Sequence, residues 1–239
     1  MVEKNSGSET FKESQKIKTY IEGLDKRLTG GIPKEQIVLV VGPSGTMKSS
    51  FCFNILYNLA LHENIKSLYF TLEQRRDSLL YQMGNLGMDI SAVENKVFVL
   101  DIGYMRKLVE TTDRHPKIEW LENVLAETRW MKEEKNIKIV VLDSLTALLG
   151  LIPEGMSRDR MYHLFEKFWD IGITCFFISE TLQNTTKFGD WGEEFLADGI
   201  IHFDFERSPR ALRLLSGIIK MRGTNIDRVY LPLAYKSGK

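Results

Sequence analysis

The sequence contains only two cysteines among 239 residues, and its formal net charge is +0 at pH 7. Cys52 and Cys175 lie in segments with the patterns of a helix and a strand, so we expect small core residues rather than a disulfide or a metal-binding pair. The four histidines show no spacing typical of metal ligands. Without a net positive charge, nothing suggests a globally basic nucleic-acid binder, although a local basic patch is not excluded.

Long apolar runs, internal repeats and proline-rich linkers are also missing. No apolar run reaches the roughly 18 residues that a membrane-spanning helix requires, and no secretory signal pattern opens the sequence. We therefore expect a cytoplasmic protein that does not enter a membrane. Hydrophobic residues make up 43% of the chain, which is enough for a sizeable core. Residues 1–16 are polar and without apolar periodicity, which predicts a mobile tail or an arm for a partner, followed by one domain over residues 17–239.

Short apolar segments alternate with segments of helical periodicity along most of this domain. The strand-like segments are 37–41, 67–72, 97–102, 137–142 and 174–179. Because most of them are apolar on both faces, the pattern predicts an α/β fold with a mostly parallel sheet and helices on each side. Three later strand-like segments (199–205, 212–221 and 228–234) have short connections, which predicts a partly antiparallel C-terminal edge.

The most informative stretch is IVLVVGPSGTMKSSFC, residues 37–52. A buried strand, a glycine-bearing turn and a helix N-terminus form a cradle for phosphate oxygens, and a lysine reaches the terminal phosphates. We therefore expect a nucleoside triphosphate site, against the alternative of an ordinary polar turn between a strand and a helix. Lys48 would contact the phosphates, and the Ser49 hydroxyl would bind Mg²⁺. The full set of expected phosphate-binding residues is Gly42, Pro43, Ser44, Gly45, Thr46, Met47, Lys48, Ser49 and Ser50.

One residue of this loop departs from the motif G-x-x-x-x-G-K-[ST], because Met47 occupies the position of the second glycine. We expect residue 47 to lie where the helix begins, a region that does not need a positive φ. The backbone would then accept methionine without strain. The expected cost is the space that the side chain takes beside the phosphates.

Two carboxylates follow strands at the edge where open α/β sheets bind their ligands. Asp143 ends the segment KIVVLD, where it could hold Mg²⁺ beside Ser49, although aspartate is also a common turn residue. Glu73 follows SLYFTL, where it could orient the water that attacks the γ-phosphorus. A solvated glutamate at the start of the next helix fits the same spacing, so the pattern alone leaves both interpretations of Glu73 open.

Two cations, Lys220 and Arg222, lie in the segment KMRGT near the end of a late strand. Residues at this spacing project to the same face of a strand, and the following glycine lets the chain turn. They could reach a triphosphate in a neighbouring subunit. Taken alone, the motif slightly favours a solvated edge instead.

Seven segments occur in an order that resembles the KaiC-like branch of the RecA superfamily of ATPases. They are IEGLD, GGIP, GPSGTMKSS, FTLE, VVLDS, WGEEFLADGII and KMRGT. The resemblance covers residue 16 to the C-terminus and implies a RecA-like P-loop core with a single KaiC domain. It also implies a homo-oligomeric ring, usually a hexamer, with ATP and Mg²⁺ between subunits.

The resemblance also implies roles for single residues. Glu73 matches the family's catalytic glutamate, Lys48 and Ser49 match the Walker A pair, and Asp143 matches the Walker B aspartate. Lys220 and Arg222 match residues that contact the γ-phosphate from the adjacent protomer, which adds them to the expected catalytic set. Gln74 replaces a second carboxylate that often follows the catalytic one, so we expect slow turnover.

A further position in the resemblance concerns the phosphoryl acceptor. The dipeptide Glu194–Phe195 occupies the place where autophosphorylating KaiC domains carry serine and threonine. Neither side chain accepts a phosphoryl group, so we expect water to be the acceptor.

Three functions remain open at this point. The first is a ring-forming ATPase that couples slow hydrolysis to a conformational change. The second is a recombinase-like ATPase that binds single-stranded DNA through residues 149–160 and 182–191. These loops carry Arg158, Arg160, Lys187, Phe188 and Trp191, but also the acids Glu154, Asp159 and Asp190, which do not favour it. The third is a nucleotide-gated scaffold with little turnover, which Met47 and Gln74 suggest.

Overall fold

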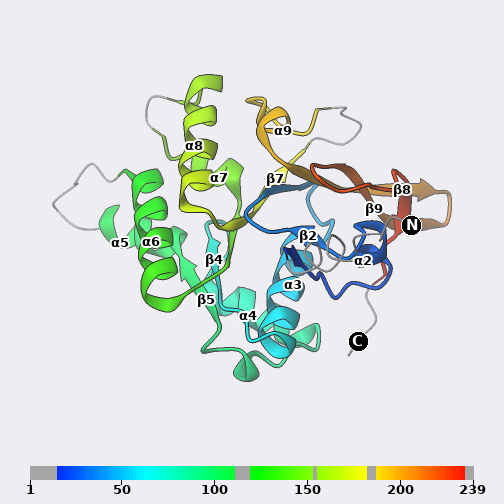
Figure 1. The fold of residues 1–239 in the computed structure, drawn as a ribbon, viewed down its shortest axis with the longest axis horizontal. Coiled ribbons are helices and arrows are strands. Elements are labelled where there is room, and N and C mark those ends of the chain that lie inside the picture. The colour runs from blue at the N-terminus through cyan, green and yellow to red at the C-terminus, as the bar shows by residue number, and fades with distance from the viewer. Residues whose placement is uncertain (1–14, 111–118, 153–154, 182–186, 235–239) are drawn as a thin grey trace, which may run out of the picture.

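The computed structural model describes residues 15–110, 119–152, 155–181 and 187–234. Its centre is an eight-stranded sheet with the strand order β10-β9-β8-β3-β7-β6-β4-β5, shown in Figure 1. The pairs from β8 through β5 are parallel, whereas β9 and β10 are antiparallel to their neighbours. This confirms the expected α/β fold with an antiparallel C-terminal edge.

The strands of the large sheet follow the apolar segments of the sequence closely. They are β3 (Ile37–Gly42), β4 (Ser67–Thr71), β5 (Val97–Asp101), β6 (Ile139–Asp143), β7 (Thr174–Glu180), β8 (Gly199–Ser208), β9 (Ala211–Met221) and β10 (Tyr230–Pro232). A separate antiparallel pair consists of β1 (Lys16–Ile17) and β2 (Ile32–Pro33). Every residue of β3, β4 and β6 is buried, which explains why these strands are continuous apolar runs rather than alternating ones.

The helices connect the strands and cover the sheet. They are α2 (Leu24–Arg27), α3 (Lys48–His62), α4 (Arg76–Asn85), α5 (Ile102–Glu110), α6 (Trp120–Lys135), α7 (Leu145–Leu149), α8 (Arg158–Ile171) and α9 (Glu193–Leu196), with a 3₁₀ turn at Ile90–Ala92. Within the described ranges, no helix has the length and apolar character that crossing a membrane requires.

The core consists of two apolar clusters, one on each face of the sheet. Alternate residues of β3 enter different clusters: Val38 and Val40 pack with α3 and α4, whereas Leu39 and Val41 pack with α6 and α8. This is the period of two that a strand imposes. Both cysteines are free and buried, as expected for small core residues.

Several boundaries differ from the expectation by one to three residues, and two of these differences move a residue into another element. Lys16, assigned to the tail, begins β1, and its ammonium group donates to the carbonyl groups of Leu28 and Thr29, both at 2.8 Å. Ile102 begins α5 instead of ending the preceding strand. Residues 1–14 of the expected tail lie outside the described residues.

Candidate functional site

The expected phosphate loop connects the end of β3 to the start of α3. A Cβ atom at Gly42 would lie 2.5 Å from the carbonyl oxygen of Phe203, so no larger residue fits there. Gly45 has φ +82°, a left-handed conformation that favours glycine. The Thr46 hydroxyl donates to the Pro43 carbonyl at 2.7 Å, which closes the loop on itself. The loop and the following helix N-terminus therefore have the form of an anion cradle.

Met47 corrects one expectation about this loop. It caps α3 with φ 62° and ψ 22°, a left-handed conformation, so the expectation that residue 47 avoids a positive φ was wrong. This conformation costs a residue with a Cβ about 1–2 kcal/mol. The side chain is half-buried and lines an apolar pocket with Phe51, Met88 and Leu233. Contacts in this pocket offset part of the strain.

Lys48 lies almost completely buried at the centre of the site, with 7% of its surface exposed. Its ammonium group donates to the carbonyl oxygens of Gly42 and Pro43, both at 2.8 Å. Burial lowers the pKa of Lys48, and the charges of Glu180, Asp143 and Glu73 oppose this shift. One lysine is therefore surrounded by three carboxyl groups.

Glu180 was not among the expected site residues. It is the last residue of β7 and pairs with Gly42 in the register of the sheet. The signal that identified Asp143, an apolar strand ending in a carboxylate, is also present in the segment TCFFISE. The same reasoning would have found Glu180.

Asp143 lies at the end of β6, with 9% of its surface exposed. The Tyr69 hydroxyl donates to its Oδ2 atom. Burial raises the pKa of Asp143, and the nearby hydroxyl groups of Tyr69 and Ser49 act in the opposite direction. The structure therefore brings together the two residues expected to bind Mg²⁺.

Glu73 lies two residues after β4, at the same edge of the sheet as Asp143. The Ser144 hydroxyl donates to its Oε1 atom and accepts the Ala147 amide at 3.1 Å, which caps α7. The adjacent Gln74 turns along α4 instead, where its amide donates to Ser78 and Gln82 at 3.0 and 3.1 Å. The Glu73 carboxylate is thus fixed beside the end of β6, while the Gln74 side chain bonds to α4.

The donor set of the site fits Mg²⁺ held with a nucleotide. Within the described ranges, no group of three or more His, Cys, Asp or Glu side chains is arranged to hold a metal ion. Mg²⁺ usually takes one or two carboxylates together with phosphate oxygens and waters rather than an all-protein cage. Asp143 and Ser49 supply one carboxylate and one hydroxyl, and this is the chemistry that such a site needs.

Lys220 and Arg222 lie near the amino end of β3, whereas the phosphate loop follows its carboxyl end. Both donate to the Phe195 carbonyl, at 3.3 Å each. Arg222 also pairs with Asp198 at 2.9 Å, and Asp198 accepts the Ile37 amide at the start of β3. Since the loop follows the other end of this six-residue strand, the two sites are roughly 17 Å apart along it.

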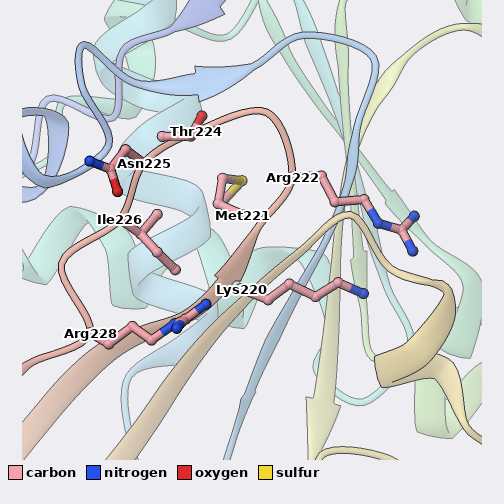
Figure 2. Close-up of a pocket in the computed structure, with 7 residues that line it drawn as sticks. All are labelled: Lys220, Met221, Arg222, Thr224, Asn225, Ile226 and Arg228. Atoms are coloured by element: carbon pink, nitrogen blue, oxygen red, sulfur yellow. The ribbon is translucent and has the colours of Figure 1, made fainter.

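Figure 2 shows Lys220 and Arg222 extending in the same direction from the end of β9, as the strand spacing predicts. Next to them is an open cavity of about 240 Å³. Its lining residues are Lys220, Met221, Arg222, Thr224, Asn225, Ile226 and Arg228.

The loops considered for DNA binding are only partly described, because Glu154 and residues 182–186 lie outside the described ranges. The Arg158 guanidinium lies 5.7 Å from the ring centre of Phe195, and Arg160 donates to the Gly155 carbonyl at 3.0 Å. Both arginines therefore already have partners within the chain.

Comparisons with known proteins show which families and structures this chain resembles. The family model described as "ATPase: KaiC" matches residues 17–237. The UPF0273 protein PH0284 of Pyrococcus horikoshii is 31% identical over 224 residues, covering 89% of this chain and 87% of the relative. The circadian clock oscillator protein KaiC of a Picosynechococcus strain is 27% identical over 92% of this chain, which spans 43% of that protein. The crystal structure of the KaiC-like protein PH0186 from Pyrococcus horikoshii matches with TM-score 0.79 and 25% identity, covering 93% of this chain and 96% of that one.

Proposed function

This chain belongs to the KaiC family of ATPases, and from that premise we propose that it binds Mg-ATP between adjacent copies of itself in a ring. Hydrolysis there is slow and is coupled to a change in the shape of the ring. The observation that carries this proposal is that the phosphate loop and the two cations lie at opposite ends of the strands of one sheet.

The separation of these two groups supports assembly in a direct way. Lys220 and Arg222 are too far from the phosphate loop of their own chain to contact the same nucleotide. They reach a triphosphate only if one copy places this end of the sheet against the loop of the next copy. Such a head-to-tail contact uses two different surfaces, and repeating it closes into a ring when the rotation allows. A hexamer is the ring size that the family suggests.

Each side chain has a distinct task in the proposed reaction. The loop amides and Lys48 bind the phosphate oxygens, and Glu73 orients a water molecule in line with the γ-phosphorus. The water oxygen forms the new P–O bond, the bond to the β-phosphate oxygen breaks, and the water proton passes to Glu73 or to the released phosphate. Ser49 and Asp143 would hold Mg²⁺, which would supply positive charge to the phosphates.

The cations of the neighbouring copy would stabilise the charge that develops as the phosphate bond breaks. Residues of this kind contribute about 10³ or more to the rate of phosphoryl transfer. Water is the proposed acceptor, because neither Glu194 nor Phe195 carries a hydroxyl group.

The nucleoside would lie beside the first two turns of α3. The apolar pocket there is lined by Ile21, Met47, Ser50, Phe51, Asn54, Met88 and Leu233. It adjoins the phosphate loop directly, so a base extending from bound phosphates can reach it. In this arrangement the Met47 side chain contacts the nucleoside.

A second candidate, a scaffold whose shape ATP fixes with little turnover, is supported by Gln74. This residue supplies no second carboxylate, and its amide bonds along α4 rather than toward Glu73. The two candidates differ in one measurable quantity, which is the rate of phosphate release by the assembled ring.

The experiment measures solution mass and phosphate release with and without Mg-ATP. It then uses two variants, Glu73→Gln and the double change Lys220→Ala with Arg222→Ala, each of which should lose hydrolysis alone. Co-expressed with different tags and purified through both, they form mixed rings. About a quarter of the interfaces in such rings combine an intact Glu73 with intact cations, so activity should return to about that fraction.

Three outcomes separate the candidates. Recovery in mixed rings supports the shared site. Mixed rings that stay as inactive as either variant, or a monomer that hydrolyses ATP at the full rate, would overturn it. An assembled wild-type ring that binds ATP without releasing phosphate would favour the scaffold.

A further inference from the structure

We propose that Tyr69 is a positioning residue for the Mg²⁺ site, because its hydroxyl holds the Asp143 carboxylate in the orientation that binds the ion. This inference rests on the proposed nucleotide function and adds a residue to it. It concerns one atom, the phenolic oxygen, and not the aromatic ring.

The sheet register explains how this tyrosine reaches the site. Tyr69 pairs with Val141 across the parallel strands β4 and β6. Asp143 is two residues beyond Val141, so its side chain lies on the same face of the sheet. This is the face that α3 covers, and Ser49 lies in the first turn of that helix. The long ring carries the hydroxyl diagonally toward the strand end, where it meets the carboxylate.

The surroundings of the ring are apolar. Tyr69 is fully buried, and its ring centre lies 5.7 Å from that of Phe53. A phenylalanine would fill the same space, so packing does not require the oxygen. A buried hydroxyl is costly unless it has a hydrogen-bond partner, and here that partner is the Asp143 carboxylate. The Tyr69 hydroxyl thus bonds the carboxylate that would bind Mg²⁺.

The consequence for metal binding follows from geometry. Mg²⁺ requires nearly ideal octahedral coordination at short distances, so a ligand that rotates binds it poorly. With 9% of Asp143 exposed, little water is available to hold the carboxylate in place of Tyr69. Removing a group that orients a metal ligand typically weakens metal binding about 10–100-fold.

The test is Tyr69→Phe, which deletes only the hydroxyl. The matched control is Tyr20→Phe, because the Tyr20 hydroxyl also bonds a carboxylate, Glu63 at 2.8 Å. Glu63 lies just beyond the far end of the 15-residue helix α3, roughly 20 Å from its start. Both variants are compared with wild type by circular dichroism and thermal melting before binding is measured.

Binding of a fluorescent, slowly hydrolysed ATP analogue is titrated with Mg²⁺, and repeated in EDTA. For Tyr69→Phe we expect the half-saturating Mg²⁺ concentration to rise about 10-fold, while affinity in EDTA stays at the wild-type value. Tyr20→Phe should leave both quantities unchanged. In an Asp143→Asn background, adding Tyr69→Phe should have no further effect, since the group it orients is gone.

Each result decides the matter. An unchanged Mg²⁺ requirement in Tyr69→Phe, or an equal loss of affinity in EDTA and in Mg²⁺, would show that the tyrosine is only structural. A further loss in the Asp143→Asn background would do the same. Wild-type protein that binds the analogue without any dependence on Mg²⁺ would instead overturn the metal site itself, and with it part of the proposed function.

Discussion

Replacing Met47 by glycine and, separately, by alanine tests the left-handed start of α3. Both changes remove the thioether from its apolar pocket, so this loss cancels when the two variants are compared. What remains is the backbone preference of residue 47. At φ 62°, glycine should be more stable than alanine by about 1 kcal/mol, because only alanine has the Cβ that this conformation penalises.

The opposite preference applies inside a helix, where alanine is favoured over glycine by about 1 kcal/mol. The stability of the glycine variant relative to the alanine variant should therefore differ by about 2 kcal/mol between a left-handed and a helical residue 47. Urea denaturation of the nucleotide-free protein measures it, provided that the variants share one m value. Arg129, exposed in the middle of α6, supplies the control pair, for which alanine should be the more stable residue.

A Met47→Ala protein more stable than Met47→Gly would refute the left-handed conformation. It would also restore the expectation from sequence that α3 simply begins at this residue.

Two further predictions concern stability. Gly42→Ala should lower the free energy of unfolding by about 2 kcal/mol or more, because the new Cβ meets the Phe203 carbonyl and a backbone atom cannot move aside cheaply; urea denaturation measures this, and an unchanged midpoint would contradict the geometry. Burial lowers the pKa of His202, with Asp204 opposing only part of the shift, so the unfolded chain binds a proton at a higher pH than the folded one. Stability should therefore fall as the pH decreases below about 6.5 and level off below the lowered pKa. A His202→Gln variant should lose that part of the slope, and an identical slope in both proteins would contradict it.

Much of the fold was predictable because burial leaves a direct mark on the sequence. Strands buried on both faces, such as β3 and β6, must be apolar throughout, and the helices between them keep one apolar side. The antiparallel edge was also predictable, since β8 and β9 are long and joined by a short turn. The four-residue helix α9 was not, because a single turn has no periodicity to detect.

The candidate site was predictable where it depends on strand ends and not where it depends on neighbours across the sheet. Asp143 and Glu73 each follow an apolar run, so the sequence marks them one at a time. Tyr69 and Asp143 are 74 residues apart in the sequence. Their contact can be predicted only if β4 is known to lie beside β6. The conformation of Met47 depends on the closed loop, which no local preference for methionine indicates.

The charges around Lys48 lead to a last prediction about assembly. One lysine faces Glu73, Asp143 and Glu180, so a single chain offers a triphosphate one positive group among three acidic ones. Bound Mg²⁺ would offset part of this repulsion, and the adjacent copy would add two more cations, Lys220 and Arg222. Nucleotide binding should therefore be tighter in the ring than in the isolated chain.

By thermodynamic linkage, the factor by which the ring binds ATP more tightly than the monomer must equal the factor by which bound ATP favours ring formation. The affinity of wild-type protein for Mg-ATP should consequently increase as protein concentration rises through the range in which the ring forms. For the double variant Lys220→Ala with Arg222→Ala, the affinity should stay constant over the same range. Titrations at several protein concentrations, with the mass measured in each, decide the question. Equal affinity of the wild-type monomer and ring would mean that the acidic cluster is neutralised within one chain, and the cations at the far end of the sheet would then need another role.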